Sequence, residues 1–386
     1  MSVGPPELTM TPGTPFGVYV HVPFCSSRCG YCDFNTYTPG EAGGSDPDGW
    51  LAGLRAELAA AARAIGPVTA QTVFVGGGTP SLLGAKRLSG VLEAVADHFP
   101  LARGAEVTTE ANPESTSPAF FAEIREAGFT RVSLGMQSVS RAVLAVLDRV
   151  HSPGRAPAAA REARAAGFAH VNVDLIYGTP GESDADLIAS VDAALDAGVD
   201  HVSAYALTVE DGTALARRIR RGEVPGTDED ILAHRYELVD ERLREAGLYW
   251  YEVSNWGRDG AECRHNMGYW TGGQWWGAGP GAHGSVGEHR WWNVKHPGSY
   301  AETACRGELP VAGWERLGPR EHHVETMMLG LRLRRGIPLG SLSAAERCRA
   351  EAAVSDGLLR LIDGRLVLTG RGRLLADAVV RDILDD

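Results

Sequence analysis

Cysteine is scarce in this chain, with six residues among 386. A small secreted scaffold held together by disulfides is short and rich in cysteine, so the composition excludes that class. No run of about 18 uninterrupted apolar residues occurs, which argues against a membrane-spanning helix. Lysine and arginine total 37 against 49 aspartates and glutamates, a formal net charge of −12, and so acidic a chain is a poor general nucleic-acid binder.

The N-terminal segment, residues 1–15, lacks the parts of an export signal. It has neither a basic stretch nor an apolar run and is rich in proline, glycine and threonine, so a flexible tail is expected there. The few cysteines are then most simply reduced thiols in a reducing cytoplasm. An apolar content of 44% over 386 residues is sufficient for one large or two ordinary domains with a full core.

Short β-branched runs alternate with longer helical patterns over residues 16–248. Several of the helical patterns end at a glycine, the residue expected just beyond a helix. Strands alternating with helices predict an α/β fold with a parallel sheet, either curled into an incomplete (β/α) barrel or left open as a doubly wound sheet. In both cases ligands bind at the carboxyl ends of the strands. The expected strands are Val18–Val22, Thr72–Val75, Glu106–Thr109, Arg131–Leu134, Val171–Ile176 and His201–Leu207.

The character of the sequence changes after Leu248. Residues 249–292 hold seven of the nine tryptophans, interleaved with glycines, and the segment 249–317 is expected to form ordered loops or a ligand surface. In the final part, residues 318–386, the dipeptide Asp363-Gly364 separates two apolar runs and predicts a tight hairpin. With helical patterns around this hairpin, and a last helix expected over Arg371–Leu384, the pattern predicts a smaller, mainly helical, winged-helix-like domain.

Three cysteines follow the first expected strand in C-x3-C-x2-C spacing: Cys25, Cys29 and Cys32. Thiolates are the usual ligands of iron–sulfur clusters. Three of them leave one iron of a four-iron cluster open, and an open iron can bind a substrate or a cofactor. A zinc site completed by His21, or three unrelated buried thiols, is the plainer alternative. We favour the open cluster because the loop lies at a strand end.

A glycine-rich turn, Gly76-Gly77-Gly78-Thr79-Pro80, follows the second expected strand. Consecutive glycines let a backbone approach a ligand closely and expose its amide and carbonyl groups. Beside an iron with an open position, such a turn is suited to the ammonium group of an amino acid. On its own the motif indicates no more than a tight turn.

These motifs, together with four polar residues after later strands, resemble the radical S-adenosylmethionine (SAM) superfamily. The four polar residues are Glu110, Gln137, Arg149 and Asp174. More narrowly, the chain is similar to the oxygen-independent coproporphyrinogen III oxidase family, from about Gly17 into the C-terminal domain. The resemblance implies a partial (β/α)6 radical-SAM barrel over residues 16–248, carrying a [4Fe-4S] cluster and SAM.

The resemblance also implies roles for single residues. Cys25, Cys29 and Cys32 would hold the cluster, and its open iron would chelate the amino and carboxylate groups of SAM. Physically, Arg149 suits a carboxylate and Asp174 suits ribose hydroxyls. Taken singly, each of these residues is as readily explained by the ordering of a loop. The positions expected to contact SAM are Tyr19, Tyr31, Gly77, Gly78, Thr79, Glu110, Gln137, Arg149 and Asp174.

Two branches of the family share this core. One branch, the oxidase, decarboxylates two propionates of coproporphyrinogen III, and the other, the HemW type, is regarded as a group of heme chaperones. The oxidase pattern carries a further cysteine two residues after the third, where this chain has Phe34. The segment Cys263–Trp270 holds the H-N-x-x-Y-W signature of the chaperone branch. A heme chaperone is therefore expected, with the oxidase as the alternative, and catalytic activity of this chain is left open.

Heme iron is ligated by an imidazole or a thiolate, and aromatic rings pack on a porphyrin face. His265, Cys263 and Tyr269 are the candidates for heme contact, although hydrogen bonding and core packing would explain the same residues. The expected partners are heme and an acceptor protein, a respiratory membrane enzyme being one candidate, and a homodimer is open. Rival heme-contacting residues are His283, His322 and His323 for the iron and Arg332, Arg334 and Arg335 for the propionates.

Overall fold

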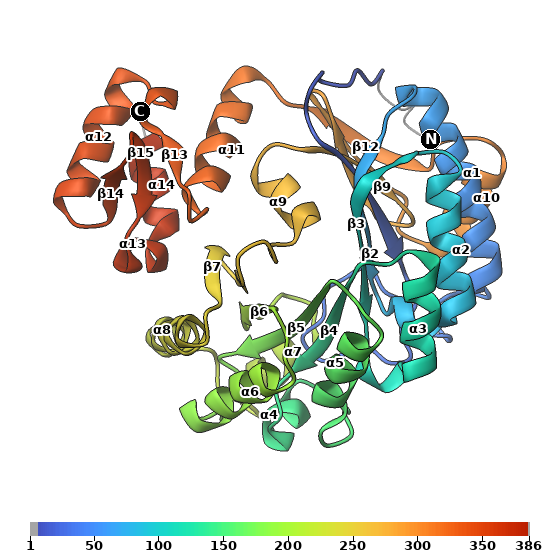
Figure 1. Ribbon diagram of the computed structural model, residues 1–386, viewed down its shortest axis with the longest axis horizontal. Coiled ribbons are helices and arrows are strands. Elements are labelled where there is room, and N and C mark those ends of the chain that lie inside the picture. Colours follow the sequence, from blue (N-terminus) through green and yellow to red (C-terminus); the bar gives the residue numbers. More distant parts are fainter. Residues whose placement is uncertain (1–6, 385–386) are drawn as a thin grey trace.

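The computed structural model describes residues 7–384, so residues 1–6 of the expected tail lie outside the described part. Six parallel strands form its centre and pair in chain order (Figure 1). The sheet curves but does not close, which confirms the expected α/β fold with an incomplete barrel. The six strands are β1 (Phe16–Val22), β2 (Ala70–Gly77), β3 (Leu101–Ala111), β4 (Arg131–Gln137), β5 (His170–Tyr177) and β6 (His201–Ala206).

Helices cover the outer face of this sheet (Figure 1). Their starts follow from capping side chains, as at Ser117, whose hydroxyl accepts from the Phe120 amide, and at Ser183, which forms a capping box with Asp186. The short helix after β4 ends before Asp148, which adopts a positive φ of 50°. The helices are α1 (Pro47–Ile65), α2 (Gly84–Ala96), α3 (Pro118–Ala127), α4 (Arg141–Val146), α5 (Arg155–Ala165), α6 (Asp184–Asp196), α7 (Ala214–Arg220) and α8 (Glu229–Glu245), with short 3-10 turns at Pro80–Leu83 and Pro113–Ser115.

The glycine- and tryptophan-rich segment forms strands rather than the loops expected from its sequence. Within residues 7–384 one sheet has twelve strands, in the order β12-β11-β10-β9-β1-β2-β3-β4-β5-β6-β8-β7. The segment therefore extends both edges of the central sheet. Its elements are β7 (Tyr249–Glu252), β8 (Asn255–Gly257), α9 (Arg264–Trp270), β9 (Gln274–Ala278), β10 (His283–Val286), β11 (His289–Asn293), α10 (Pro297–Cys305) and β12 (Val311–Arg316).

Glycines in this segment make room for tryptophan rings on neighbouring strands. Trp291 lies directly across from Gly284, where a Cβ would come within 2.1 Å of the indole. Trp292 lies across from Gly313 in the same way, at 2.5 Å. A glycine facing an indole replaces the usual alternation of apolar side chains, so the strands carry no clear period-two pattern.

The C-terminal part has a small core of its own, built around Met327, Leu331 and Ile383. The expected hairpin is confirmed: Asp363 and Gly364 have positive φ of 49° and 74°, as a two-residue hairpin turn requires. The expected last helix is broken near Leu375. The elements are α11 (Pro319–Leu331), β13 (Ile337–Pro338), a 3-10 turn (Leu339–Ser341), α12 (Ala344–Ser355), β14 (Leu359–Ile362), β15 (Arg365–Leu368), α13 (Gly370–Leu374) and α14 (Ala376–Leu384).

Residues 7–15 are held against the barrel. Leu8 and Met10 pack on the main core, and Thr11 exchanges two backbone hydrogen bonds with the Gln274 side chain, at 3.0 and 3.1 Å. This part of the expected flexible tail is therefore anchored at the start of β9.

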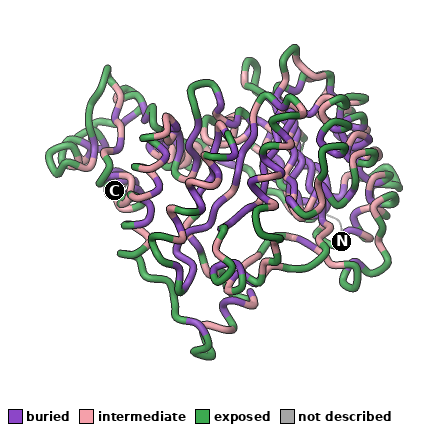
Figure 2. The backbone as a smooth tube through the Cα atoms, turned by 60° about the horizontal axis from the view of Figure 1, so that its bottom comes forward, coloured by how far each residue is buried: buried purple, intermediate pink, exposed green. Residues whose placement is uncertain are grey.

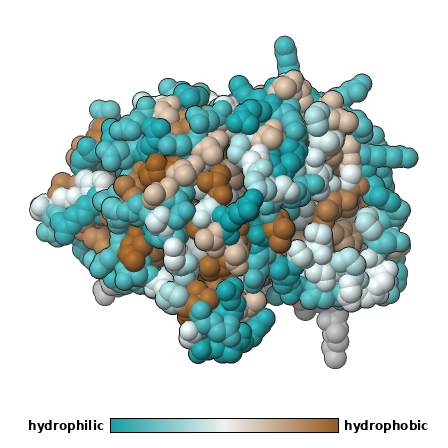
Figure 3. All heavy atoms as spheres, turned by 90° about the horizontal axis from the view of Figure 1, so that it is seen from below, coloured by the Kyte–Doolittle hydropathy of each residue, from teal (hydrophilic) through white to brown (hydrophobic). Residues whose placement is uncertain are grey.

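Buried stretches, purple in Figure 2, concentrate in the interior, while exposed green stretches run along the outer loops. The face seen from below is mostly hydrophilic, with separate apolar patches (Figure 3). Among the described residues, no helix combines the length and apolar character needed to cross a membrane. The main core is therefore the sheet and the inner sides of its covering helices.

A buried carboxylate joins α1 to the added strands. Glu57 is fully buried and accepts hydrogen bonds from Trp276 Nε1 (3.3 Å), the Gly279 amide (2.8 Å), Asn293 Nδ2 (2.8 Å) and the Tyr300 hydroxyl. Two donors reach each of its oxygens. One side chain of α1 therefore satisfies polar groups of β9, β11, α10 and the loop after β9.

Replacing Glu57 by glutamine tests this role. The amide keeps the shape but its nitrogen cannot accept, so two donors lose their acceptor, each at a cost of about 1–3 kcal/mol. We expect the free energy of unfolding in Glu57→Gln to fall by about 2–4 kcal/mol, measured by urea denaturation with tryptophan fluorescence. The matched change Glu93→Gln, on the exposed face of α2, should stay within about 0.5 kcal/mol of the parent. Equal stability of both variants would contradict the role of Glu57.

Candidate functional site

A cavity of about 690 Å³ opens inside the curve of the sheet, at the carboxyl ends of the central strands. Its walls come from β1–β6, from the loops that follow these strands and from α9. The structure brings all the residues singled out in the sequence for cluster, SAM and first-choice heme contact to this cavity. They are Tyr19, Cys25, Cys29, Tyr31, Cys32, Gly77, Gly78, Thr79, Glu110, Gln137, Arg149, Asp174, Cys263, His265 and Tyr269.

The cysteine loop is fixed by backbone hydrogen bonds to distant segments. The Cys25 amide donates to Tyr37 O (3.1 Å), and Gly30 links to Leu147 and Leu215 through its amide and its carbonyl. The three cysteines are free thiols and partly buried. The loop therefore presents its sulfur atoms from a backbone that is already ordered.

The zinc alternative lacks its fourth ligand. Both ring nitrogens of His21 are hydrogen-bonded, Nδ1 with the Tyr19 hydroxyl (3.0 Å) and Nε2 with Asn35 O (2.9 Å). Within residues 7–384, no three histidines, cysteines or acidic residues are arranged around a single ion. A cubane cluster instead takes each thiolate on a separate iron.

The glycine turn packs against the backbone that leads into the cysteine loop. Gly77 has a φ of 108°, and a Cβ at Gly78 would come within 2.6 Å of Phe24 O. Its amides are used inside the protein: Gly77 N donates to Glu110 Oε2 (3.0 Å), Gly78 N to Val22 O (2.7 Å) and Thr79 N to Phe24 O (2.8 Å). The turn is therefore left to meet a ligand through its carbonyl oxygens, which accept from an ammonium group but not from a carboxylate.

Two carboxyl groups with raised pKa lie in the same cavity. Burial, together with the nearby Asp174, raises the pKa of Glu110 to about 8. Burial also raises the pKa of Asp174, against hydrogen bonds from the Ser133 hydroxyl (3.0 Å to each oxygen) and from Asn172 Nδ2 (2.7 Å). At pH 7 Glu110 therefore holds its proton and can both donate to a bound ligand and accept from it.

Gln137 is strained and incompletely bonded. Its φ of 61° is unusual for a residue with a side chain and costs on the order of 1–3 kcal/mol. Among the described residues its buried Oε1 has no hydrogen-bond partner. An unpartnered acceptor on a cavity wall fits a ligand that brings a donor.

Arg149 lies between the cysteine loop and β4. Its Nη1 donates to Cys29 Sγ (3.3 Å) and its Nη2 to Gly135 O (3.3 Å). The sequence reasoning missed the residue that orients it: Arg149 Nε donates to His151 Nε2 (3.0 Å). A guanidinium has donors only, so this histidine nitrogen accepts and the ring is neutral. Burial and the adjacent Arg149 lower the pKa of His151 to about 4. The sequence held one signal for this contact. Arg149 and His151 are two positions apart, and side chains at alternate positions of an extended segment lie on the same side.

A second missed group orients Asp174. The Asn172 side chain donates to Asp174 through its nitrogen and accepts from His201 Nδ1 (2.6 Å) through its oxygen, so that ring nitrogen carries the proton. His201 Nε2 then faces the Tyr251 hydroxyl (2.8 Å). This chain of hydrogen bonds runs from β7 to the cavity, and no local sequence pattern predicts it.

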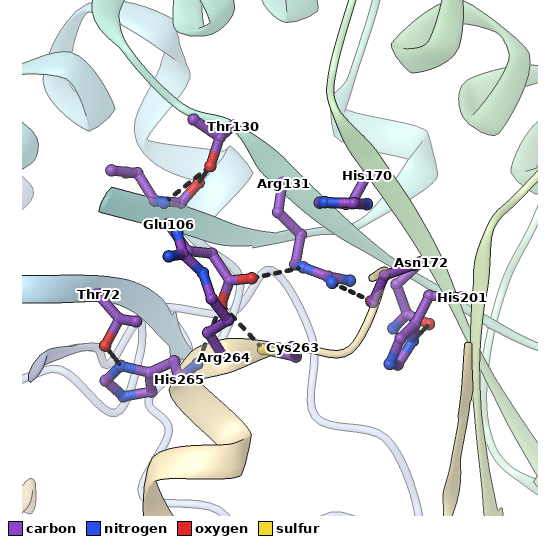
Figure 4. Close-up of polar contacts among 12 residues, drawn as sticks. Thr72, Glu106, Thr130, Arg131, His170, Asn172, His201, Cys263, Arg264 and His265 are labelled. Carbon is purple, nitrogen blue, oxygen red and sulfur yellow. Dashed lines mark hydrogen bonds and ion pairs between the residues drawn. The ribbon is translucent and has the colours of Figure 1, made fainter. Parts of the chain in front are cut away.

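The H-N-x-x-Y-W segment is fixed to the interior of the barrel by Glu106 of β3 (Figure 4). Glu106 accepts from Arg131 Nε (3.2 Å), from the His265 amide (3.0 Å) and from Cys263 Sγ (3.4 Å). Arg131 also donates to the carbonyl of Ala261. These contacts set the position of the first turn of α9.

His265 and Cys263 are occupied by these internal contacts. Thr72 Oγ1 and the Tyr269 hydroxyl each lie 2.8 Å from a ring nitrogen of His265. Burial lowers the pKa of His265 to about 4 and, with Glu106 beside the thiol, raises the pKa of Cys263 to about 12. Hydrogen bonding and packing therefore account for the positions of both residues, and both ring nitrogens of His265 are engaged.

The rival heme residues lie away from the cavity. His323 contacts Glu346 (2.6 Å), and His322 is its neighbour on α11. Arg332 pairs with Asp377, and Arg334 lies over the Tyr249 ring at 5.0 Å. Arg335 is exposed on the loop before β13, and His283 is exposed on β10.

Two family models match the chain. The model of the radical SAM superfamily matches residues 19–194. The model of the HemN C-terminal domain matches residues 317–375.

Two curated bacterial proteins that are similar to this chain carry the same name. The heme chaperone HemW of Mycobacterium tuberculosis (strain H37Rv) is 69% identical over 379 residues, which covers 98% of this chain and 97% of that protein. The heme chaperone HemW of Bacillus subtilis (strain 168) is 30% identical over 371 residues, covering 94% and 97%. Among solved structures, the coproporphyrinogen III oxidase HemN of Escherichia coli superposes with a TM-score of 0.84 over 97% of this chain and 91% of that chain. At 20% identity, that likeness shows the fold alone.

The free energy of unfolding tests whether the buried contacts of His265 contribute to stability. His265→Ala removes a buried ring and two hydrogen bonds, so we expect the free energy of unfolding to fall by about 2–4 kcal/mol. The exposed His283→Ala should change it by less than about 0.5 kcal/mol. Urea denaturation of both variants checks this, and an unaltered midpoint for His265→Ala would show that its internal contacts are unimportant.

Proposed function

Because the chain belongs to the HemW family within the radical SAM superfamily, we propose that it binds heme and passes it to an acceptor protein. The observation that carries this proposal is the 69% identity, over 98% of the chain, with a protein named as a heme chaperone. The cysteine loop agrees with it, since Phe34 stands where the oxidase pattern has a further cysteine. That phenylalanine is 62% exposed at the rim of the cavity.

The proposal includes a [4Fe-4S] cluster and SAM in the cavity at the strand ends. Three free thiols on an ordered loop suit the cluster, and the carbonyl groups of the glycine turn suit the ammonium group of SAM. Gln137, with its unpartnered oxygen, and the carboxyl groups of Glu110 and Asp174 suit its remaining donors. A reduced cluster can supply an electron to bound SAM.

The residues around this site hold and orient rather than react. Arg149 faces a cluster thiol and is directed by His151, and Asp174 is directed by Asn172. The acceptor protein, the cytoplasmic location and a homodimer stay predictions from the sequence.

One sample tests the chaperone against the oxidase. Protein reconstituted anaerobically with iron and sulfide is titrated with hemin, and we expect a saturable, stoichiometric change in the Soret band. The same sample, given coproporphyrinogen III, SAM and a reductant, is expected to form no protoporphyrinogen IX. Accumulation of protoporphyrinogen IX would establish the oxidase instead, and an absent response to hemin would remove the heme-binding function.

The His151 contact gives a second test, directed at SAM. His151→Ala removes the acceptor that aims Arg149, and one charge-assisted hydrogen bond is worth about 1.5 kcal/mol, so we expect SAM affinity to fall about tenfold. His151→Gln keeps an oxygen that can accept and should recover part of the affinity. Isothermal titration of the reconstituted protein with SAM measures both. Unchanged affinity in His151→Ala, with an unchanged cluster absorbance, would show that Arg149 needs no support.

A further inference from the structure

The carboxyl group of Asp174 is held by side chains of its own and the neighbouring strand. The Ser133 hydroxyl lies 3.0 Å from each carboxyl oxygen, and Asn172 Nδ2 donates to Oδ1 (2.7 Å). The same amide nitrogen lies 2.5 Å from the Ser133 hydroxyl and 2.9 Å from the Ser203 hydroxyl. Oxygen atoms therefore surround one end of the Asn172 side chain. Because an amide nitrogen only donates, this end is the NH2 group and the amide oxygen points away from Asp174.

A histidine on the next strand holds the other end of this amide (Figure 4). His201 of β6 is 2% exposed, and its Nδ1 lies 2.6 Å from Asn172 Oδ1. Since an amide oxygen only accepts, Nδ1 carries the ring proton. Burial, with the Arg131 guanidinium nearby, holds the pKa of His201 well below its ordinary value, so the ring is neutral at pH 7. The neutral ring leaves Nε2 as an acceptor.

Tyr251 of β7 supplies the donor for that nitrogen. Its hydroxyl lies 2.8 Å from His201 Nε2 and accepts from the Cys263 amide (3.3 Å). Burial holds the pKa of Tyr251 well above its ordinary value, so the hydroxyl keeps the proton that it donates. Cys263 is the N-cap of α9. The donors therefore all point one way, from the start of α9 toward Asp174, and hydrogen bonds in such a chain polarise one another.

Resting on the SAM site of the proposed function, we infer that His201 is a positioning residue for SAM. It fixes the orientation of the Asn172 amide, which holds the Asp174 carboxyl toward the ribose hydroxyls of SAM. Both ring nitrogens of His201 are engaged, so it acts on SAM through Asn172 rather than by contact. An amide turned the other way would set its oxygen against the Asp174 carboxyl and remove one of the donors to that group.

The same chain of hydrogen bonds connects the SAM site with the H-N-x-x-Y-W segment. Tyr251 is the common member, since its hydroxyl contacts both the His201 ring and the Cys263 amide. The adjacent Glu252 accepts from Asn266 Nδ2 (3.0 Å), within the first turn of α9. Two consecutive residues of β7 therefore hold the start of α9, and one of them also supports the ring of His201.

Isothermal titration with SAM of the full-length protein, after anaerobic cluster reconstitution, tests the inference. His201→Leu removes both ring hydrogen bonds, so we expect SAM affinity to fall about tenfold, the size of one lost hydrogen bond. His201→Asn places an amide N–H near the position of Nδ1 and should recover affinity to within about threefold of the wild type. The matched control is His170→Leu, which changes a histidine of β5 that contacts Asp200 instead. Its SAM affinity should stay within about twofold of the wild type.

A ligand without ribose hydroxyls separates positioning from a general structural role. The 2′,3′-dideoxy analogue of SAM brings no hydroxyl to Asp174, so the wild type and His201→Leu should bind it equally, within about twofold. Tyr251→Phe keeps the bond between His201 and Asn172, so it should lower SAM affinity less, by about threefold. Cluster absorbance and the unfolding midpoint show which variants are folded and loaded, and only these are compared.

The outcomes separate this inference from the function on which it rests. A wild type that binds no SAM removes the SAM site itself. A wild type that binds SAM, with His201→Leu binding it equally well, overturns the positioning role alone. An equal loss of affinity for SAM and for the dideoxy analogue, or no recovery in His201→Asn, also overturns it, because either result assigns His201 a purely structural role. Should His201→Leu fail to fold, Tyr251→Phe decides: a weaker affinity for SAM but not for the analogue supports the inference, and equal affinities overturn it.

Discussion

The buried ion pair between Glu106 and Arg131 determines how the inside of the open sheet is filled. Both side chains are almost without solvent exposure, at 4% and 1%. A desolvated pair is costly unless further hydrogen bonds satisfy its donors and acceptors. Here Cys263, the His265 amide and the Ala261 carbonyl bond to the pair and hold the polypeptide before α9 against it, while Arg131 Nη1 has no hydrogen-bond partner among the described residues. Arg131, Cys263 and His265 also line the cavity, so the pair fixes part of its wall.

The carboxyl ends of β3 and β4, together with Asp174 of β5, concentrate local costs. Gln137 is strained and has an unsatisfied oxygen, and burial together with the nearby Asp174 raises the pKa of Glu110. A protein selected for stability alone would replace such groups, since each disfavours the folded state. Their presence on one surface, beside three thiols, is what a ligand rich in donors would relieve. The cost is carried by the rigid strands, whose apolar residues form the main core.

The sequence was informative where the chemistry is local. β-Branched runs predicted the six central strands. The twelve cluster and SAM positions followed from the family resemblance, and all of them line one cavity. The sequence failed where partners are distant. The strands around Trp291 and Trp292 were not predicted, because the glycines opposite these rings break the usual alternation of side chains. The role of each glycine is visible only when the ring on the neighbouring strand is known. Nothing in a sequence shows that Thr72, some 190 positions away, is hydrogen-bonded to the ring of His265. His201 was missed for the same reason.

A protein that transfers heme must release it as well as bind it, and this requirement limits where the heme can be bound. Both ring nitrogens of His265 are hydrogen-bonded. Coordination of iron by this residue therefore requires that an internal hydrogen bond breaks and that the packing around α9 opens. The same two bonds fix the first turn of α9 to β2 through Thr72 and hold the Tyr269 hydroxyl within the helix. Freeing the ring of His265 therefore also removes the hydrogen bond that holds the Tyr269 hydroxyl beside it.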